Sequence, residues 1–310
     1  MKECYVVHPS LSMYQHGVKG IIKNNIVYLE GEDGSESISG IPYDRHKFPE
    51  NLTQINVDKK WGYANLDTGE VTIKPTWDYT EPFYCKRAII EDQCKYGVID
   101  ISGEYIIPLI YDFIETDYID GELFLYASKN RKTGLFDKNG NNIIDFQYEE
   151  IRLINNERLC VLKEGKWGIV DINNQILFDF NWDKIEYRGS TPFMLAGIKD
   201  KQRPLLEMTK AVQNMLNAIF GPNTSGNDEK EEYYEYKWSV FDDQYNLIIA
   251  ELDVQPFQYS QKYSDYYIIK RDGKYGVLYR EKLISNPELF KKDAIKIIKD
   301  LYLNIKNGVV

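Results

Sequence analysis

A motif of lysine, an aromatic residue and glycine recurs along this chain at nearly constant spacing. Successive copies lie about 35 residues apart, and the one longer gap is about twice that distance. A fixed period of this length is typical of proteins built from stacked structural repeats. The aromatic and glycine positions of the six copies are Trp61 and Gly62, Tyr96 and Gly97, Gly134 (after Thr133), Trp167 and Gly168, Trp238 (before Ser239), and Tyr275 and Gly276.

Each copy begins a unit whose residues predict three antiparallel strands. In the second unit, two apolar residues and Asp100 follow the motif, and Gly103 comes three residues later. Asp accepts hydrogen bonds from the backbone ahead of it and Gly tolerates a left-handed conformation, so these positions predict a hairpin turn. The returning strand is apolar and ends at an aromatic or apolar residue followed by an acid. These acids are Asp78, Asp112, Glu149, Asp183 and Asp253.

The predicted fold is an all-β repeat array of short antiparallel three-stranded meanders with a period of about 35 residues, one helical insertion and a C-terminal helix. A closed propeller is the alternative, because its blades repeat at about 40 residues. Closure requires the two ends of the chain to meet as equivalent blades, whereas both ends here depart from the repeat. The sequence therefore favours an open array.

The departures from the repeat define five segments. Residues 1–59 form an N-terminal cap that includes one candidate degenerate repeat, and residues 60–203 hold four clear repeats. Residues 204–236 form a helical insertion and an acidic, tyrosine-rich loop. Residues 237–286 hold degenerate repeats, and residues 287–310 form a capping helix.

The two predicted helices depend on different signals. Apolar residues recur at helical spacing over residues 204–220. The last helix is predicted from Asn286-Pro287-Glu288, which has the order of an N-cap, a first-turn proline and a first-turn acid. On this interpretation the last repeat loses its turn at Tyr279-Arg280-Glu281 and becomes helical.

The chain resembles the WG-repeat family, which is found mostly in bacteria and is named for the Trp-Gly pair seen at Trp61-Gly62 and Trp167-Gly168. The resemblance is clearest over residues 60–200 and resumes more weakly over 237–279. It depends on three features in register: the motif, the Asp-to-Gly turn and the aromatic-acid pair. The resemblance implies a binding or scaffolding array of β-hairpins and brings no catalytic residues with it.

Charge and composition argue against several classes of partner and compartment. A net charge of −10 is unfavourable for binding nucleic acid or an anionic membrane, so a basic protein is the better partner. The start has no apolar stretch typical of a secretory signal, and no stretch approaches the length of a membrane span. The four cysteines show no CxxC spacing. We therefore predict a cytoplasmic protein with reduced thiols.

The best candidate for a binding site is the segment from Asp228 to Tyr236, which holds five acids and three tyrosines in nine residues. Tyrosine supplies contact area at low entropic cost, and acids steer a basic partner. The alternative is a solvated linker. The predicted binding residues are Glu229, Glu231, Glu232, Tyr233, Tyr234, Glu235 and Tyr236.

Other candidate sites have weaker support. The motif rings could stack on a ligand, but buried rings that key one unit onto the next explain their regularity. Acids at strand ends usually cap turns. His8, His16 and His46 match no zinc spacing with Cys4, and no nucleophile or phosphate-binding motif is present. We therefore expect no metal, no cofactor and no enzymatic activity.

The sequence thus predicts a non-enzymatic cytoplasmic binding or scaffold protein that recognises another protein. A sharper hypothesis is an immunity-type inhibitor of a basic bacterial toxin. One alternative is a carbohydrate or cell-wall ligand bound on aromatic rows of the repeats. Another is an enzyme without a recognisable motif.

Overall fold

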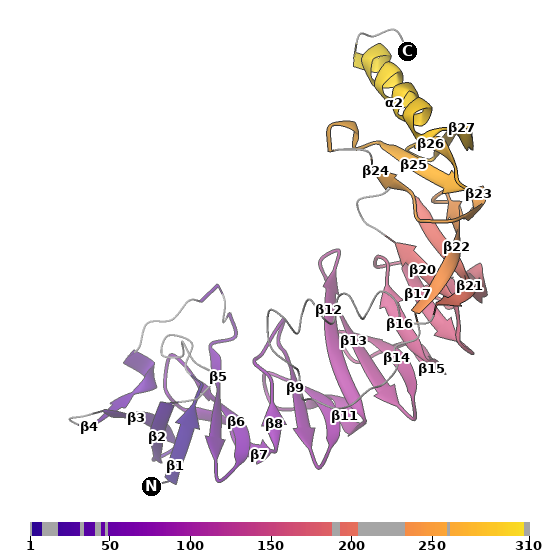
Figure 1. The fold of residues 1–310 in the computed structure, drawn as a ribbon. Coiled ribbons are helices and arrows are strands. Elements are labelled where there is room, and N and C mark those ends of the chain that lie inside the picture. The colour runs from indigo at the N-terminus through magenta and orange to yellow at the C-terminus, as the bar shows by residue number, and fades with distance from the viewer. Residues whose placement is uncertain are drawn as a thin grey trace, which may run out of the picture. The chain divides into compact units, whose positions relative to one another are not determined.

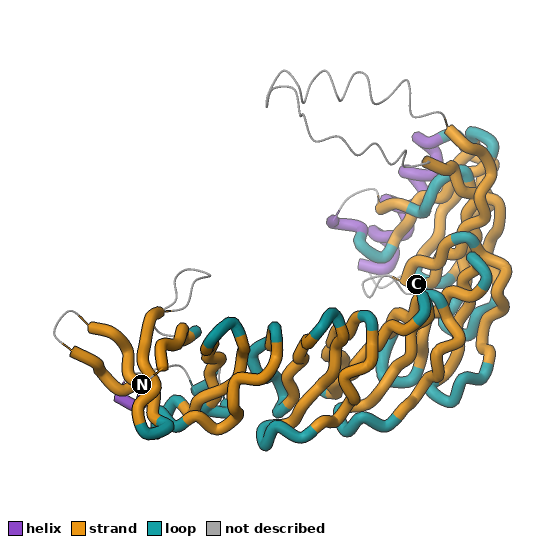
Figure 2. Tube along the Cα trace, turned by 90° about the horizontal axis from the view of Figure 1, so that it is seen from below, coloured by secondary structure: helices purple, strands orange, loops and turns teal. Residues whose placement is uncertain are grey.

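The computed structural model describes residues 2–7, 18–31, 34–40, 45–46, 49–187, 193–203, 233–258 and 261–306. Strands make up most of this part, with one α-helix, α2 (Lys291–Lys306), near the C-terminus (Figures 1 and 2). The chain divides into two compact units: one holds Met1–Leu159 and Ile172–Asn174, and the other holds Cys160–Asp171 and Gln175–Val310. None of the four cysteines, Cys4, Cys85, Cys94 and Cys160, forms a disulfide.

The first sheet has seven strands and lies in the first unit. Its spatial order is β4-β3-β2-β1-β5-β6-β7. A bridge between Ile26 and Glu70, and a hydrogen bond of 2.9 Å from Val27 N to Gly69 O, bring the start of β3 to the start of β7 and curl the sheet on itself. The strands are β1 (Lys2–Val6), β2 (Val18–Lys23), β3 (Ile26–Gly31), β4 (Gly34–Ser37), β5 (Leu52–Val57), β6 (Lys60–Asn65) and β7 (Val71–Trp77), and the short helix η1 (Ile38–Gly40) follows β4.

The second and third sheets, also in the first unit, have four antiparallel strands each and are meanders in chain order. The second sheet is β8 (Tyr79–Thr80), β9 (Arg87–Asp92), β10 (Lys95–Asp100) and β11 (Tyr105–Tyr111). The third sheet is β12 (Phe113–Ile119), β13 (Glu122–Lys129), β14 (Lys132–Asp137) and β15 (Asn142–Tyr148).

Three further four-stranded sheets follow in the chain. The fourth sheet is β16 (Glu150–Leu153), β17 (Arg158–Lys163), β18 (Lys166–Asp171) and β19 (Ile176–Trp182). The fifth sheet is β20 (Lys184–Tyr187), β21 (Met194–Arg203), β22 (Tyr233–Phe241) and β23 (Leu247–Leu252). The sixth sheet is β24 (Phe257–Gln258), β25 (Tyr266–Arg271), β26 (Lys274–Tyr279) and β27 (Lys282–Leu289), with the short helix η2 (Gln261–Tyr263) before β25.

The predicted all-β repeat array is confirmed, and the sheets add one strand to each predicted meander. The extra strand follows the aromatic-acid pair, as β8 follows Asp78. The sheets are also out of phase with the sequence repeat, because the predicted third strand of one repeat pairs with the motif strand of the next. Gln93 and Cys94, with φ of 51° and 58°, form the two-residue turn between them. No described sheet joins a strand of residues 2–57 to one of residues 257–289, so strand pairing is open, as predicted.

The predicted start of the last helix is wrong. Asn286 and Pro287 lie in strand β27, and α2 begins only at Lys291. The turn at Tyr279–Lys282 is kept, with Arg280 at a φ of 49°. Proline is tolerated in a strand where a bulge removes the need for its missing N–H, and the register of β26 and β27 shifts at this point.

Helix α2 covers one face of the sixth sheet. Ala294 and Ile298 are fully buried and pack in one cluster with Tyr266, Ile268 and Val277 of β25 and β26. The predicted C-terminal helix is therefore present. It removes from water an apolar sheet face that the last member of an array would otherwise expose.

Candidate interaction site

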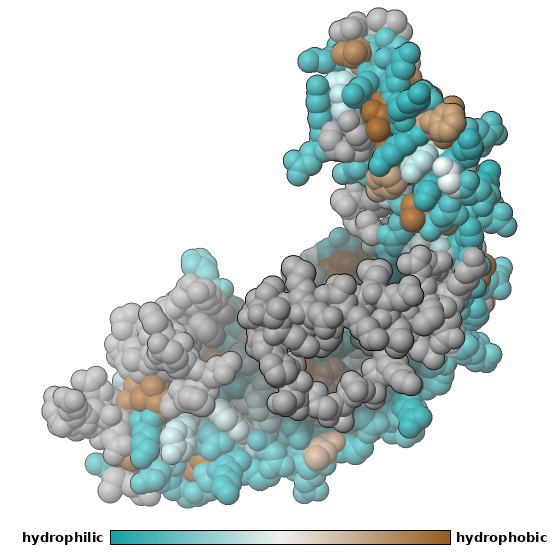
Figure 3. Space-filling view, in the orientation of Figure 1, coloured by the Kyte–Doolittle hydropathy of each residue, from teal (hydrophilic) through white to brown (hydrophobic). Residues whose placement is uncertain are grey.

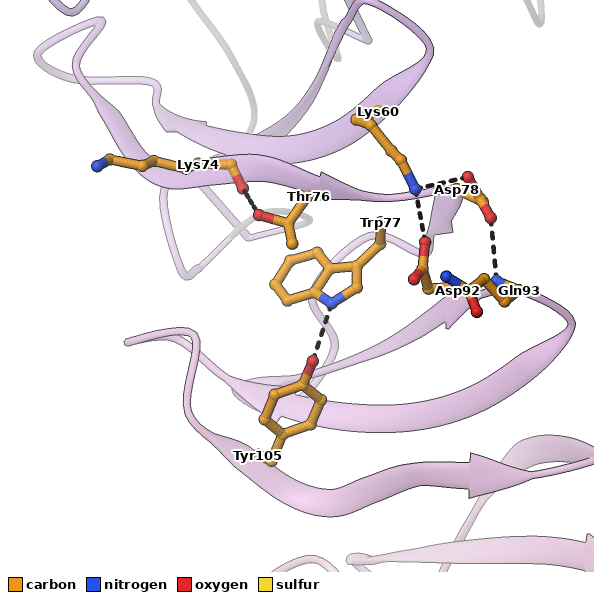
Figure 4. Close-up of polar contacts among 8 residues, drawn as sticks. All are labelled: Lys60, Lys74, Thr76, Trp77, Asp78, Asp92, Gln93 and Tyr105. Atoms are coloured by element: carbon orange, nitrogen blue, oxygen red, sulfur yellow. Dashed lines mark hydrogen bonds and ion pairs between the residues drawn. The ribbon is translucent and has the colours of Figure 1, made fainter.

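In five of the six motifs, the lysine makes an ion pair with the acid that ends the returning strand. In the first repeat, Lys60 Nζ lies 2.8 Å from Asp78 Oδ1 (Figure 4). The other pairs are Lys95 with Asp112 at 2.6 Å, Lys132 with Glu149 at 3.3 Å, Lys166 with Asp183 at 2.7 Å and Lys237 with Asp253 at 2.8 Å. Two features that look separate in the sequence are thus two halves of one contact, which we call the clamp.

The second carboxylate oxygen of the clamp accepts a hydrogen bond from the next sheet. Asp78 Oδ2 receives the N–H of Gln93 at 3.0 Å, in the hairpin turn between β9 and β10 (Figure 4). Asp112 receives the N–H of Asn130 at 3.0 Å in the same way. The lysine ion pair, followed by this backbone hydrogen bond, lowers the pKa of both carboxyls. The acids therefore connect successive sheets.

The motif glycine lies under a bulge of the neighbouring strand. In the first repeat, Trp61 pairs with Trp77 and Tyr63 pairs with Ile73. An advance of two residues on the motif strand thus faces a step of four residues on the returning strand. A Cβ on Gly62 would overlap the carbonyl oxygen of Ile73. The same step of four faces the motifs of Gly97, Gly134, Gly168 and Gly276.

The fifth motif has serine in place of glycine, and its bulge is smaller. The step from Trp238 to Val240 faces a step of only three residues, from Leu252 to Ile249. Because one residue fewer passes over the motif, the backbone leaves room for the side chain of Ser239, which is buried. The loss of the glycine and the shorter bulge therefore occur together.

Where the returning strand ends in an aromatic residue, that residue lies opposite the motif position, whereas Trp238 and Tyr275 lie opposite leucines. Trp61 pairs with Trp77, and Tyr96 with Tyr111. Trp167 and Trp238 are buried, whereas Trp61, Tyr96 and Tyr275 are half-buried. Trp77 donates its indole N–H to the hydroxyl of Tyr105 in the second sheet at 3.1 Å (Figure 4). The Trp77 ring, which lies opposite the motif ring Trp61, thus joins the first sheet to the second.

The predicted binding segment falls only partly within the described residues. Glu229, Glu231 and Glu232 lie outside them, as does the predicted helix of residues 204–220. Tyr233, Tyr234, Glu235 and Tyr236 are not part of a loop, because they belong to strand β22 and pair with β21. The Tyr236 ring lies 5.4 Å from that of Trp238. Their assignment as binding residues stays a prediction.

A cleft with an open mouth lies between the second and third sheets. It is small, with a cavity volume of about 20 Å³, and is lined by Glu81, Pro82, Tyr84, Arg87, Ile89, Val98, Thr116 and Leu125. Its floor is apolar, because Ile89, Val98 and Leu125 are buried. The two sheets contribute opposite walls, the β8–β9 segment on one side and edge strand β12 on the other.

Exposed aromatic rings flank this cleft. Tyr84 and Tyr118 are 52% and 50% exposed, and their rings meet edge to face at 5.9 Å. Arg87 donates Nε to Lys138 O at 2.5 Å and Nη1 to Lys86 O at 2.9 Å, so the backbone holds its guanidinium. Burial raises the pKa of Glu81, whose carboxylate has no hydrogen bond or ion pair among the described residues. The cleft combines apolar area, aromatic edges and one unsatisfied acid, which suits binding.

The family model of the WG containing repeat matches residues 61–92, 96–131 and 134–167. These three segments are WG repeats. The WG repeats supply the strands from β6 to the start of β18, and therefore both walls of the cleft. No curated protein matches the chain.

Several solved structures are similar to the chain at low identity. A eukaryotic initiation factor is 12% identical, with 92% of this chain and 84% of that chain covered, at a TM-score of 0.34. The Pan2 WD40 domain of Neurospora crassa is 11% identical, with 75% and 73% covered, at 0.28. A protein of unknown function from Bacteroides caccae is 12% identical, with 73% and 89% covered, at 0.24.

Sequence reasoning missed both the clamp and the cleft. The clamp has a sequence signal, since its lysine and acid are separated by 18, 17, 17, 17 and 16 residues in the five repeats. The cleft has no such signal, because Glu81 and Tyr84 line it only once they lie opposite a strand of the next repeat. Only the pairing of β8 with β9 places them opposite β12.

The surface of the face shown in Figure 3 is mainly hydrophilic, and its hydrophobic residues occur singly or in small groups. Among the helices that the structure describes, none has both the length and the apolar character needed to cross a bilayer.

Proposed function

We propose that this chain is a non-enzymatic binding protein that recognises another protein at the cleft between its second and third sheets. The observation that carries the proposal is the cleft itself, with an apolar floor and two half-exposed tyrosines at its mouth. Tyrosines in such positions supply much of the binding energy in protein interfaces, since their rings are large and have few rotamers. A net charge of −10 favours a basic partner.

The test compares variants of the exposed tyrosines. A Tyr84→Ala and Tyr118→Ala double variant should reduce capture of the partner from native lysate and increase its dissociation rate by about tenfold or more, because buried anchors act mainly on dissociation. Tyr187→Ala is the matched control, since Tyr187 is 40% exposed on β20. If the double variant and the control capture the same proteins with equal dissociation rates, the cleft is not the interface.

A finer form of the proposal is an immunity-type inhibitor of a basic bacterial toxin. Its support is the excess of 48 acidic over 38 basic residues, which would speed association with a basic protein. The test is co-expression with a basic toxin encoded beside this gene. Growth should be restored by the wild type and not by the Tyr84 and Tyr118 double variant, whereas equal protection by both would contradict this form of the proposal.

A further inference from the structure

The second and fifth sheets present the same arrangement of residues next to the motif ring. In the fifth sheet, Lys184, Gly197 and Trp238 occupy one row across three strands. In the second sheet, the equivalent row is Tyr79, Glu91 and Tyr96. Residues paired in this way lie on the same face of a sheet. The residue two positions after the first member is a glutamate in both: Glu186 in the fifth sheet and Glu81 in the second.

In the fifth sheet this arrangement holds a cation from the chain itself. Lys184 Nζ lies 2.8 Å from Glu186 Oε1. The same ammonium group lies 5.7 Å from the ring centre of Trp238 and 5.8 Å from that of Tyr236. A carboxylate and two aromatic faces are the surroundings that stabilise an ammonium or guanidinium group.

The second sheet has the carboxylate and the rings but not the cation. Tyr79 stands where the fifth sheet has Lys184, and it is 44% exposed. Phe113 of β12 adds a ring 5.6 Å from that of Tyr96. Within the part of the chain that the structure describes, neither Glu81 nor Glu91 has an ion-pair partner. Burial first, and then the charge of Glu81, raise the pKa of Tyr79.

No other sheet that lies within one unit combines the two features. The third sheet has Glu115 at the carboxylate position, but Thr133 replaces the motif ring. In the first sheet, Val7 follows Tyr5 at the position of Glu81. In the sixth sheet, Phe257 takes that position. Among the sheets that lie within one unit, the combination of glutamate and motif ring without an internal lysine therefore occurs in the second sheet, which also forms one wall of the cleft.

We infer that the second sheet binds a lysine or arginine side chain of a basic partner protein between Glu81 and the rings of Tyr79 and Tyr96. This inference rests on the proposed function, because it assigns the chemistry of the partner that the cleft receives. The aliphatic part of the incoming side chain packs on the apolar floor, and its charged end replaces the lysine that the fifth sheet supplies internally. The site thus selects basic side chains over neutral ones of the same shape.

The decisive variant fills the site with an internal cation. Tyr79→Lys rebuilds in the second sheet the arrangement of Lys184 and Glu186, so it should block an external cation. Tyr187→Lys is the matched control, because it adds the same charge at another exposed tyrosine. Circular dichroism and the melting temperature of each variant verify that the fold is retained.

The probe is an acetylated and amidated Gly-Arg-Gly peptide, compared with the same peptide carrying neutral citrulline, in NMR titrations at low salt. Wild type and Tyr187→Lys should bind the arginine peptide at least tenfold more tightly than the citrulline peptide, and Tyr79→Lys should lose this preference. Equal binding of the two peptides by the wild type would overturn the inference. So would an unchanged preference in Tyr79→Lys.

Capture from lysate separates this inference from the proposed function. If Tyr79→Lys captures the partner as the wild type does while the Tyr84 and Tyr118 double variant fails, the cleft binds a protein but the cation site is wrong. If the peptide preference is present while the double variant captures normally, the cation site exists and the proposed interface is wrong. Loss of capture in both variants supports both proposals.

Discussion

The glycine of the motif is required by the backbone that crosses it. In the first repeat, the carbonyl oxygen of Ile73 occupies the space that a Cβ on Gly62 would need. Backbone atoms cannot move aside as the end of a flexible side chain can, so any larger residue must displace the bulge. The Trp-Gly pair therefore meets two requirements. Its ring packs between repeats, and its glycine has no side chain that would collide with the bulge.

Gly62→Val should destabilise the chain by about 1–3 kcal/mol, the usual cost of inserting carbon atoms into a packed site. Urea unfolding followed by circular dichroism measures the change. Gly121→Asn is the control, because nothing lies within 4 Å of its Cβ position and asparagine adopts the positive φ of 85° at low cost. An equal effect of the two substitutions would show that the bulge does not press on Gly62.

At the scale of single residues, the sequence revealed the motif but not its contacts. Lys60 and Asp78 each recur, yet a recurring lysine and a recurring acid are also what two independent solvated positions produce. Their pairing depends on the bulge, because the returning strand must shift its register to bring Asp78 beside Lys60. The role of Glu81 and Tyr84 was harder to predict, since they line a cleft only after the second and third sheets pack together.

At the scale of elements, strands were predictable because their apolar residues, turns and acids recur in register. The start of α2 was not, since Asn286 and Pro287 fit two environments equally well. Proline with a preceding asparagine suits the first turn of a helix, but it also suits a bulge where no N–H is needed. In the sixth sheet, Asn286 and Pro287 lie in the bulge. The backbone of Asn286 crosses Gly276 there, just as the bulge of the returning strand crosses the motif glycine in other repeats.

Packing of α2 should contribute strongly to the stability of the sixth sheet. Ile298→Ala should cost about 2–4 kcal/mol, because the side chain is fully buried against β25 and β26. Leu303→Ala on the same helix is the control and should change stability by less than about 0.5 kcal/mol, since Leu303 is 53% exposed. Hydrogen exchange of the β26 amides would report the loss locally. Equal protection in the two variants would mean that α2 does not stabilise the sheet.

At the scale of the whole molecule, the clamps make the stability of the folded state depend on pH. The ionised clamp carboxylates are stabilised in the folded state, which lowers the pKa of Asp78, Asp112, Asp183 and Asp253. A lowered folded pKa means that the stabilisation is complete above the ordinary carboxyl pKa of about 4 and is lost as the pH falls below it. At low pH the folded chain should therefore lose stability at several of the contacts that the clamps make between successive sheets.

Asp112→Asn tests this dependence at one junction. At pH 7 the variant should melt at a lower temperature than the wild type, because it loses the ion pair with Lys95. As the pH falls below the ordinary carboxyl pKa of about 4 and through the lowered pKa of folded Asp112, the difference should shrink, since the wild-type carboxyl then becomes protonated and loses its ion pair too. Glu104→Gln, at an exposed carboxyl without an ion pair among the described residues, is the control. A difference in melting temperature that does not change with pH would contradict the clamp.

The offset between sequence repeat and sheet has a consequence for how such a gene grows. A repeat that begins at the motif supplies a motif strand and a returning strand to one sheet, and the first two strands to the next. Duplication of one whole repeat, wherever the break occurs, therefore inserts a complete sheet with its own clamp and leaves both neighbours intact. Gene duplication can therefore lengthen the protein one sheet at a time, while the first sheet and the helix-covered sixth sheet stay unchanged.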